Sequence, residues 1–302
     1  MTMGAFARFG GLIKSQRTQE GLLRSGTRRF LTRSANQVGL TILALGIIAA
    51  LIPPWILPSN PTRVAVQDRF LPPVAFGGTW SHPLGTDTLG RDLGCRLVYA
   101  ARFTMSVTLL AAMLSMLVGV AAGMFAGYWG RWVDSAISRL VDIQMAFPAI
   151  FLAVGVLAVA GSSFLNLVFV LAAVDWVSYA RVIRSSVLTI RDREYVEAAG
   201  ALGAGGSRIL FRHLLPNLAT PIIVLLTYSA ARLMLTESAL SFLGLGIVPP
   251  ASTWGGMTGD GRNYLHDAWW VSTVPGVIIA ATVLSINFVG DGLRDAFDPQ
   301  LK

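Results

Sequence analysis

The chain has 302 residues, of which 54% are hydrophobic and only 13% are charged. Soluble domains carry about 25% charged residues, so this composition leaves too little polar surface for a globule and predicts a membrane protein. The net charge of +8 does not indicate nucleic acid binding, because the basic residues lie in tails and short connectors and form no basic, aromatic-rich face. A single cysteine, Cys95, excludes an intrachain disulfide, and three histidines far apart in sequence argue against a metal site.

A polar, arginine-rich tail over residues 1–37 precedes the first apolar segment. A hydrocarbon core about 30 Å thick needs about 20 mostly apolar residues in a helix. By this measure the chain contains six candidate transmembrane helices, near residues 38–57, 103–127, 140–161, 164–180, 218–243 and 272–290. The tail is too long for the charged start of a signal peptide, so we expect an uncleaved anchor, with a cleaved leader as the alternative. The predicted fold class is an all-α polytopic membrane protein.

Basic residues are distributed unevenly among the connectors. The tail holds seven and the 181–217 connector six, whereas the 161–163 connector holds none and the 244–271 connector only Arg262. Because cytoplasmic loops carry the excess of Lys and Arg, we predict that both termini and the 181–217 loop face the cytoplasm. The predicted parts are a cytoplasmic tail (1–37), a first transmembrane helix (38–58), an extracytoplasmic segment (59–102) and a core with five transmembrane helices (103–302).

The extracytoplasmic segment ends in a charged run, GTDTLGRD, which places Asp87, Arg91 and Asp92 within a short stretch before the second span. We expect these side chains to cap the helix and to form local ion pairs. The alternative is contact with a soluble protein that docks on the outer face, since exposed charges suit that role.

Two features are expected to shape the spans. Gly119, Gly123 and Gly127 repeat every four residues, so they share one helix face on which a second backbone can approach closely. We interpret them as helix-packing residues. Pro148 lies inside the third span and should kink it, because proline removes a backbone hydrogen bond and clashes with the preceding turn.

Four charged residues fall inside or near the spans. Arg232 and Glu237 lie in the fifth, Asp142 near the start of the third and Asp175 near the end of the fourth. Arg232 and Glu237 are five residues apart and do not share a helix face, so direct pairing within the helix is not expected. Because charge inside a membrane is costly, we expect at least one of the two to line a solute route; a structural buried pair is the alternative. Asp142 and Asp175 are interpreted as structural.

The 181–217 loop has its own predicted structure. EYVEAAGAL is a good helix former with acids in its first turn, Gly203 can end it, and Ser207 is a plausible N-cap for a second helix, RILFRHLL. Pro216 then opens the fifth span.

This loop resembles the cytoplasmic motif of permeases of ATP-binding-cassette (ABC) importers. Glu197, Ala198 and Ala199 are followed three residues later by Gly203, and after nine more by HLLP ending at Pro216. A histidine at position 213 replaces the usual isoleucine, as is common in the dipeptide branch. HPLGTDTLGRDLGCRLVYAARFTMSV, ALSFLGLGIVPPASTWGGM and FVGDGLRDAFDPQLK also resemble the C-type permease of dipeptide, oligopeptide and nickel importers, so the likeness covers roughly residues 38–302.

The resemblance implies a type I ABC importer permease in a bacterial inner membrane. Its expected partners are a second homologous permease, two ATP-binding subunits, an extracytoplasmic solute-binding protein and membrane lipid. The 194–207 helix would dock in the ATPase. No G-x-x-x-x-G-K-[ST] loop is present, so ATP and Mg²⁺ are expected on the partner subunits, with no cofactor on this chain.

Peptide is the preferred solute, and nickel or another small solute is the alternative. A self-powered secondary transporter would predict inverted repeats, and none is found. A membrane-embedded enzyme would need a cluster of reactive side chains at one depth, and no such convergence is evident in the sequence.

Overall fold

The computed structural model describes residues 33–52, 54–57 and 59–297. Within these ranges the regular structure is helical, with one isolated antiparallel bridge between Thr86 and Asp92. The predicted basic tail falls largely on residues 1–32, outside the described residues.

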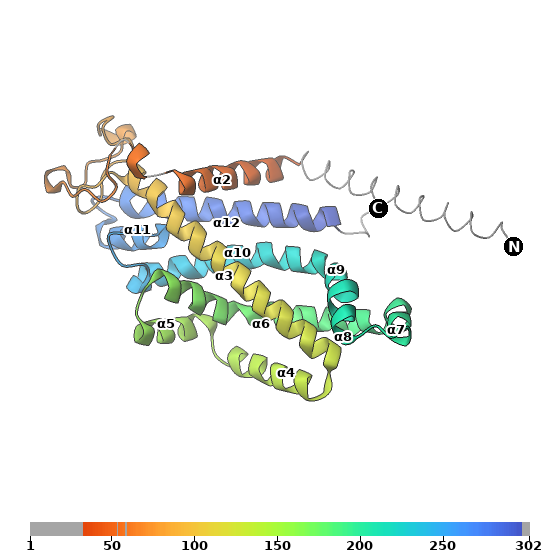
Figure 1. The fold of residues 1–302 in the computed structure, drawn as a ribbon. Coiled ribbons are helices and arrows are strands. Elements are labelled where there is room, and N and C mark those ends of the chain that lie inside the picture. Colours follow the sequence, from red (N-terminus) through yellow and green to blue (C-terminus); the bar gives the residue numbers. More distant parts are fainter. Residues whose placement is uncertain (1–32, 53, 58, 298–302) are drawn as a thin grey trace.

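Five helices are long and apolar enough to cross a membrane (Figure 1). They are α2 (Ser34–Leu51), α3 (Leu93–Trp129), α6 (Phe164–Arg191), α10 (Ala219–Leu240, continued by a π-helical segment, Ser241–Leu245) and α12 (Trp270–Phe297). Two shorter helices, α4 (Arg131–Met145) and α5 (Ala149–Ala160), meet at 86° and supply a sixth span if they are counted as one. The prediction of an all-helical polytopic protein is confirmed, with five or six candidate spans among the described residues.

The break between α4 and α5 lies at the predicted proline. Pro148 has ψ of 128° and precedes α5 as its N-cap residue, so the backbone leaves the helical conformation there. The predicted kink is a bend of 86°, which divides the expected third span into two helices that meet almost at a right angle.

Several helices differ in extent from the predicted spans. The fourth span was predicted to end at 180, but α6 continues to Arg191, so the first third of the predicted loop is helical. The first span was predicted to reach 57, but α2 ends at Leu51, where Ile52 adopts the extended conformation that a following proline favours. The second was predicted to begin at 103, but α3 begins ten residues earlier, because the Asp92 side chain caps it by accepting a hydrogen bond from Cys95 N at 2.7 Å.

No local pattern in the sequence predicted α11 (Trp254–Gly261), which is rich in glycine, a poor helix former. Tertiary contacts hold it instead. The indole of Trp254 donates a hydrogen bond to Leu97 O at 2.9 Å, and its backbone N–H donates to Thr104 Oγ1 at 3.0 Å. Gly255 lies so close to the Ser238 backbone that an added Cβ would be 2.6 Å from the Ser238 carbonyl oxygen.

The glycine face of α3 packs against α6, as predicted. A Cβ on Gly123 would lie 2.6 Å from Ala180 O, and one on Gly127 would lie 2.8 Å from Val187 Cβ. The corresponding atom on Gly119 would be 2.5 Å from Tyr179 Cβ. Only glycine permits this approach, so α3 and α6 form a close-packed pair that runs through the length of the protein (Figure 1).

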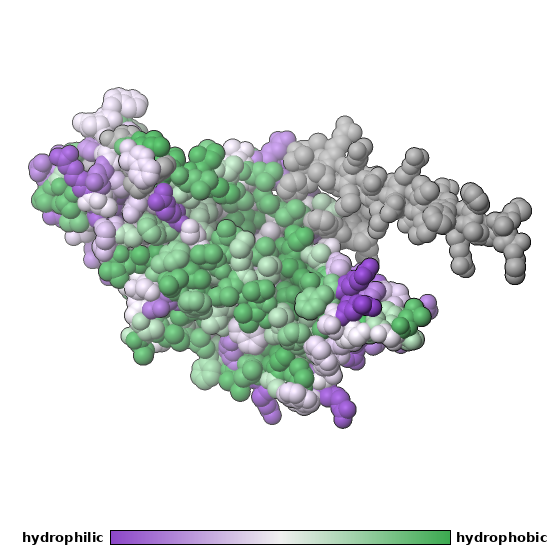
Figure 2. Space-filling view, in the orientation of Figure 1, coloured by the Kyte–Doolittle hydropathy of each residue, from purple (hydrophilic) through white to green (hydrophobic). Residues whose placement is uncertain are grey.

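Apolar side chains cover the middle of the molecule, and hydrophilic residues gather toward its ends, near the α2–α3 connection and near α7 and α8 (Figure 2). Leu117 and Val159, for example, are 67% and 91% exposed. Such a belt suits lipid or a second membrane subunit.

Candidate functional site

The predicted helix of the 181–217 loop is present as α7 (Glu194–Ala201), which follows α6 after two residues. Its first turn contains Glu194 and Glu197, which complement the positive end of the helix dipole. Val196 is its one buried residue, and it packs in a cluster with Ile183 and Leu210. Glu197 and Ala198 are exposed and Ala199 is half-buried, so most of the α7 surface is free of intramolecular contacts.

Glycine ends α7, as the sequence predicted. Gly203 has φ of +85°, a left-handed conformation that side chains disfavour. Leu202, just before it, is 90% exposed, so the exit places an apolar side chain at the tip of the loop.

The second helix of the loop differs from the prediction. It begins with α8 (Gly206–Arg208), passes through a π-helical segment (Ile209–Leu214) and ends in α9 (Leu215–Asn217). Gly205 occupies the N-cap position and makes no side-chain cap, so the predicted capping by Ser207 was wrong. Pro216 lies in the first turn of α9, where a proline costs no hydrogen bond, and α10 begins three residues later.

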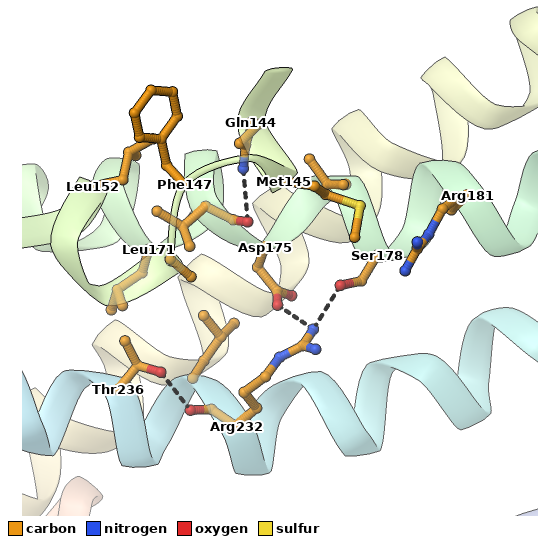
Figure 3. Close-up of a pocket in the computed structure, with 14 residues that line it drawn as sticks. Gln144, Met145, Phe147, Leu152, Leu171, Asp175, Ser178, Arg181, Arg232 and Thr236 are labelled. Atoms are coloured by element: carbon orange, nitrogen blue, oxygen red, sulfur yellow. Dashed lines mark hydrogen bonds and ion pairs between the residues drawn. The ribbon is translucent and has the colours of Figure 1, made fainter. Parts of the chain in front are cut away.

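A second candidate site lies between α6, α10 and the α4–α5 break (Figure 3). Arg232 of α10 forms an ion pair with Asp175 of α6, and it donates a further hydrogen bond to Ser178 Oγ at 3.0 Å. The Asp175 carboxylate also accepts hydrogen bonds from Ser115 of α3, at 3.3 Å, and from Ser229 of α10. Three helices therefore meet at one buried carboxylate.

This network borders a cavity of about 240 Å³. Gln144 and Phe147 contribute one wall from the α4–α5 break, and Ser178, Arg181 and Thr236 contribute polar atoms from α6 and α10 (Figure 3). The sequence predicts that Arg232 can line a solute route, but it places Arg181 in a cytoplasmic connector. The signal that could have found it is the spacing Asp175, Ser178, Arg181, which places the three side chains on one face of a continuous helix.

Glu237 does not share this cavity. It is fully buried on the other side of α10, where it accepts hydrogen bonds from Ser241 Oγ at 2.6 Å and Ser238 Oγ at 3.5 Å. The structure therefore separates Arg232 from Glu237, and Glu237 is buried away from the cavity that Arg232 lines.

The charged run before α3 forms a compact network. Asp87 is fully buried and accepts from Arg91 Nε at 2.6 Å and from Arg96, which also reaches Asp260 Oδ2 at 3.1 Å. Asp92 caps α3. These contacts are the local capping and ion pairing expected from the sequence, and they leave Asp87 inaccessible to a docked protein.

The arrangement as a whole is a bundle of candidate membrane helices with a polar cavity between α6 and α10 and an exposed helix, α7, at one end. Residues 119–302 match the family model of the "Binding-protein-dependent transport system inner membrane component". The chain belongs to this family and is a multi-pass inner-membrane subunit of an ABC importer, a class that works with ATPase subunits and a binding protein.

Similarity to other permeases extends over most of the chain. The di/tripeptide transport system permease protein DppC of Pseudomonas aeruginosa is 41% identical over 266 residues, covering 87% of this chain and 88% of the relative. The glutathione transport system permease protein GsiD of Pectobacterium atrosepticum is 36% identical over 276 residues, covering 91% and 90%.

The fold also matches a solved structure. A chain of the MetNI methionine ABC transporter in an inward-facing conformation superposes with a TM-score of 0.55 at 20% identity, covering 67% of this chain and 97% of that chain. At this identity the likeness shows the fold alone.

Proposed function

We propose that this chain forms half of the pathway of an ATP-driven importer of short peptides, together with a second, homologous permease. The similarity to a di/tripeptide permease over most of both chains supports peptides as the solute. Nickel or another small solute is the alternative, because selectivity in such systems rests mostly with the binding protein. ATP and Mg²⁺ would bind to two partner ATPase subunits, and both termini would face the cytoplasm.

The observation that carries the proposal is the exposed surface of α7. One side chain, Val196, anchors the helix, while Glu197, Ala198 and Leu202 point away from the bundle. Small alanines offer a flat surface that can enter a groove, and an apolar side chain that is 90% exposed costs free energy unless a partner covers it. An ATPase groove would supply that cover.

A route for mechanical coupling follows from the helix bounds. α7 begins just after α6, and α6 is one continuous helix from Phe164 to Arg191 that carries Asp175 of the cavity. The glycine face of α3 packs tightly on α6. Displacement of α7 by a closing ATPase would therefore move α6 and α3 together and change the shape of the cavity.

A docked binding protein would meet the opposite end of the bundle. Asp260, 42% exposed, is the accessible member of the charge network there, since the Arg91 side chain is only 13% exposed and Asp87 and Asp92 are buried. Docking would therefore use the rim of this network and the surrounding connectors, not the buried aspartates.

The decisive experiment is peptide-dependent ATP hydrolysis and uptake by the reconstituted importer carrying Ala198→Asp. We expect both activities to be lost while the chain still inserts in the membrane, because the substitution places a charge in the proposed contact without touching the core. Ser135→Asp, at an exposed position in the first turns of α4, is the matched control and should retain both. Wild-type coupling in A198D would refute the assignment of α7.

A further inference from the structure

The cavity between α6 and α10 has an excess of positive charge. Arg181 and Arg232 line it together with one carboxylate, Asp175. Ser115 and Ser229 donate to Asp175 Oδ2, while the Arg232 guanidinium is held at Oδ1. The negative charge of Asp175 is therefore already paired within the protein, and the lining retains one net positive charge.

These charges lie where charge is expensive. Asp175 is the twelfth residue of α6 and Arg232 the fourteenth of α10, so both sit near the middle of their spans. Charged side chains at such depth face a water-filled space or each other, and they commonly mark the route of a polar solute. A purely structural ion pair with Asp175 would need only Arg232, and it would leave the presence of Arg181 in the cavity unexplained.

Both guanidinium groups have donors to spare. Arg232 uses one nitrogen, Nη2, for Asp175 and Ser178, although a guanidinium carries five N–H donors, and its side chain is 54% exposed. Arg181 is exposed, and in the described part of the chain it has no ion-pair partner within 4 Å. In Figure 3 its guanidinium extends from α6 into the space on the side where Arg232 lies. Two guanidinium groups that line one cavity are suited to a carboxylate.

The apolar wall and the volume of the cavity indicate which carboxylate ligands fit it. Met145, Phe147 and Leu152 make one side of the cavity apolar. Its volume of about 240 Å³ is below the roughly 300–1,000 Å³ of sites that enclose a whole small ligand. The space therefore suits one end of an extended ligand, with an apolar side chain against the apolar wall and a carboxylate near the arginines.

We infer that Arg181 and Arg232 form a transient binding site for the C-terminal carboxylate of a peptide in transit, with Asp175 as the positioning residue that holds Arg232. This inference rests on the peptide import proposed above. A weak site is expected, because a residue that binds a solute too tightly would slow its release.

The test measures binding to the complete importer in nanodiscs without its binding protein, by saturation-transfer NMR. The probes are alanyl-alanine, its C-terminal amide and N-acetyl-alanyl-alanine. We expect weak binding of the two free acids and at least about tenfold weaker binding of the amide, since a charge-assisted hydrogen bond is lost. Equal binding of acid and amide, or no binding of the acids, would overturn the inference.

Two variants locate the site. Arg181→Gln, which breaks no ion pair, should weaken binding of both acids about tenfold and leave amide binding unchanged. Arg139→Gln, on an exposed position of α4 outside the cavity, removes the same charge and should have no effect. If Arg181→Gln binds the acids like the wild type, the site is wrong.

Peptide uptake with the binding protein present, measured in parallel, tests the proposed import separately. Import that continues in all variants would reject the site alone. Absence of peptide uptake by the wild type would reject the proposed function.

Discussion

The close contact between α3 and α6 can be tested with a single methyl group. In Gly123→Ala the new Cβ would lie 2.6 Å from Ala180 O and 2.9 Å from Ile183 Cβ. Carbon and oxygen normally approach to about 3.3 Å, so the helices must separate by roughly 0.7 Å. The obstructing atoms are a backbone oxygen and a Cβ, and neither can move without displacing its helix.

Forcing extra volume into a close-packed site costs about 1–3 kcal/mol. The better helix propensity of alanine offsets about 0.5–1 kcal/mol of this, so the midpoints of the two ranges leave a net loss of about 1.3 kcal/mol. For a chain of this size each kcal/mol lowers Tm by about 2–4 °C, so we expect Gly123→Ala to melt about 3–5 °C below the wild type.

The measurement is the midpoint of heat-induced loss of the monodisperse importer peak, followed by size-exclusion chromatography. Gly155→Ala in α5 is the matched control, because nothing lies within 4 Å of the position that its new Cβ would occupy, and it should melt at or slightly above the wild-type temperature. If Gly123→Ala and Gly155→Ala have the same Tm, the close approach of α3 and α6 does not depend on glycine and the packing described above is incorrect.

Three further predictions use the same assay, and each gives a loss of stability that lowers Tm. Arg232→Gln should lower the stability by about 3 kcal/mol, because it leaves the buried carboxylate of Asp175 without a cation. Asp175→Asn should lower it by about 1 kcal/mol, because Arg232 is 54% exposed; the reverse order would contradict the burial assigned to the pair. Asp87→Asn, at the fully buried centre of the outer network, should cost about 3 kcal/mol. Asp260→Asn, at its 42% exposed rim, should cost less than about 1 kcal/mol, and equal losses would show that the rim is buried. Trp254→Phe removes the indole hydrogen bond that anchors α11 and should cost about 1–2 kcal/mol; an unchanged Tm would mean that α11 is held by other contacts.

The sequence alone determined those features that depend on neighbouring residues. Apolar runs identified the spans, the four-residue spacing of Gly119, Gly123 and Gly127 identified the packing face, and Gly203 marked the end of α7. Each is a property of one helix or turn, where the side chains that matter are fixed by local geometry.

Helix ends were harder to predict, since hydropathy reports where a chain leaves the membrane and not where a helix stops. The polar positions Arg181 and Arg184 ended the predicted fourth span, yet α6 continues through both to Arg191. In α11 the local signal was absent, because glycine-rich sequence has low helix propensity, and contacts with α3 and α10 supply the stability.

Only the tertiary structure decided which charges meet. Asp175 and Arg232 are 57 residues apart, and Arg96 and Asp260 are 164 apart. Whether such residues face each other depends on the rotation and depth of whole helices, which are set by packing along their full length. A charge in a span can therefore be recognised from sequence as one that needs a partner, but the identity of the partner comes from the way the helices pack.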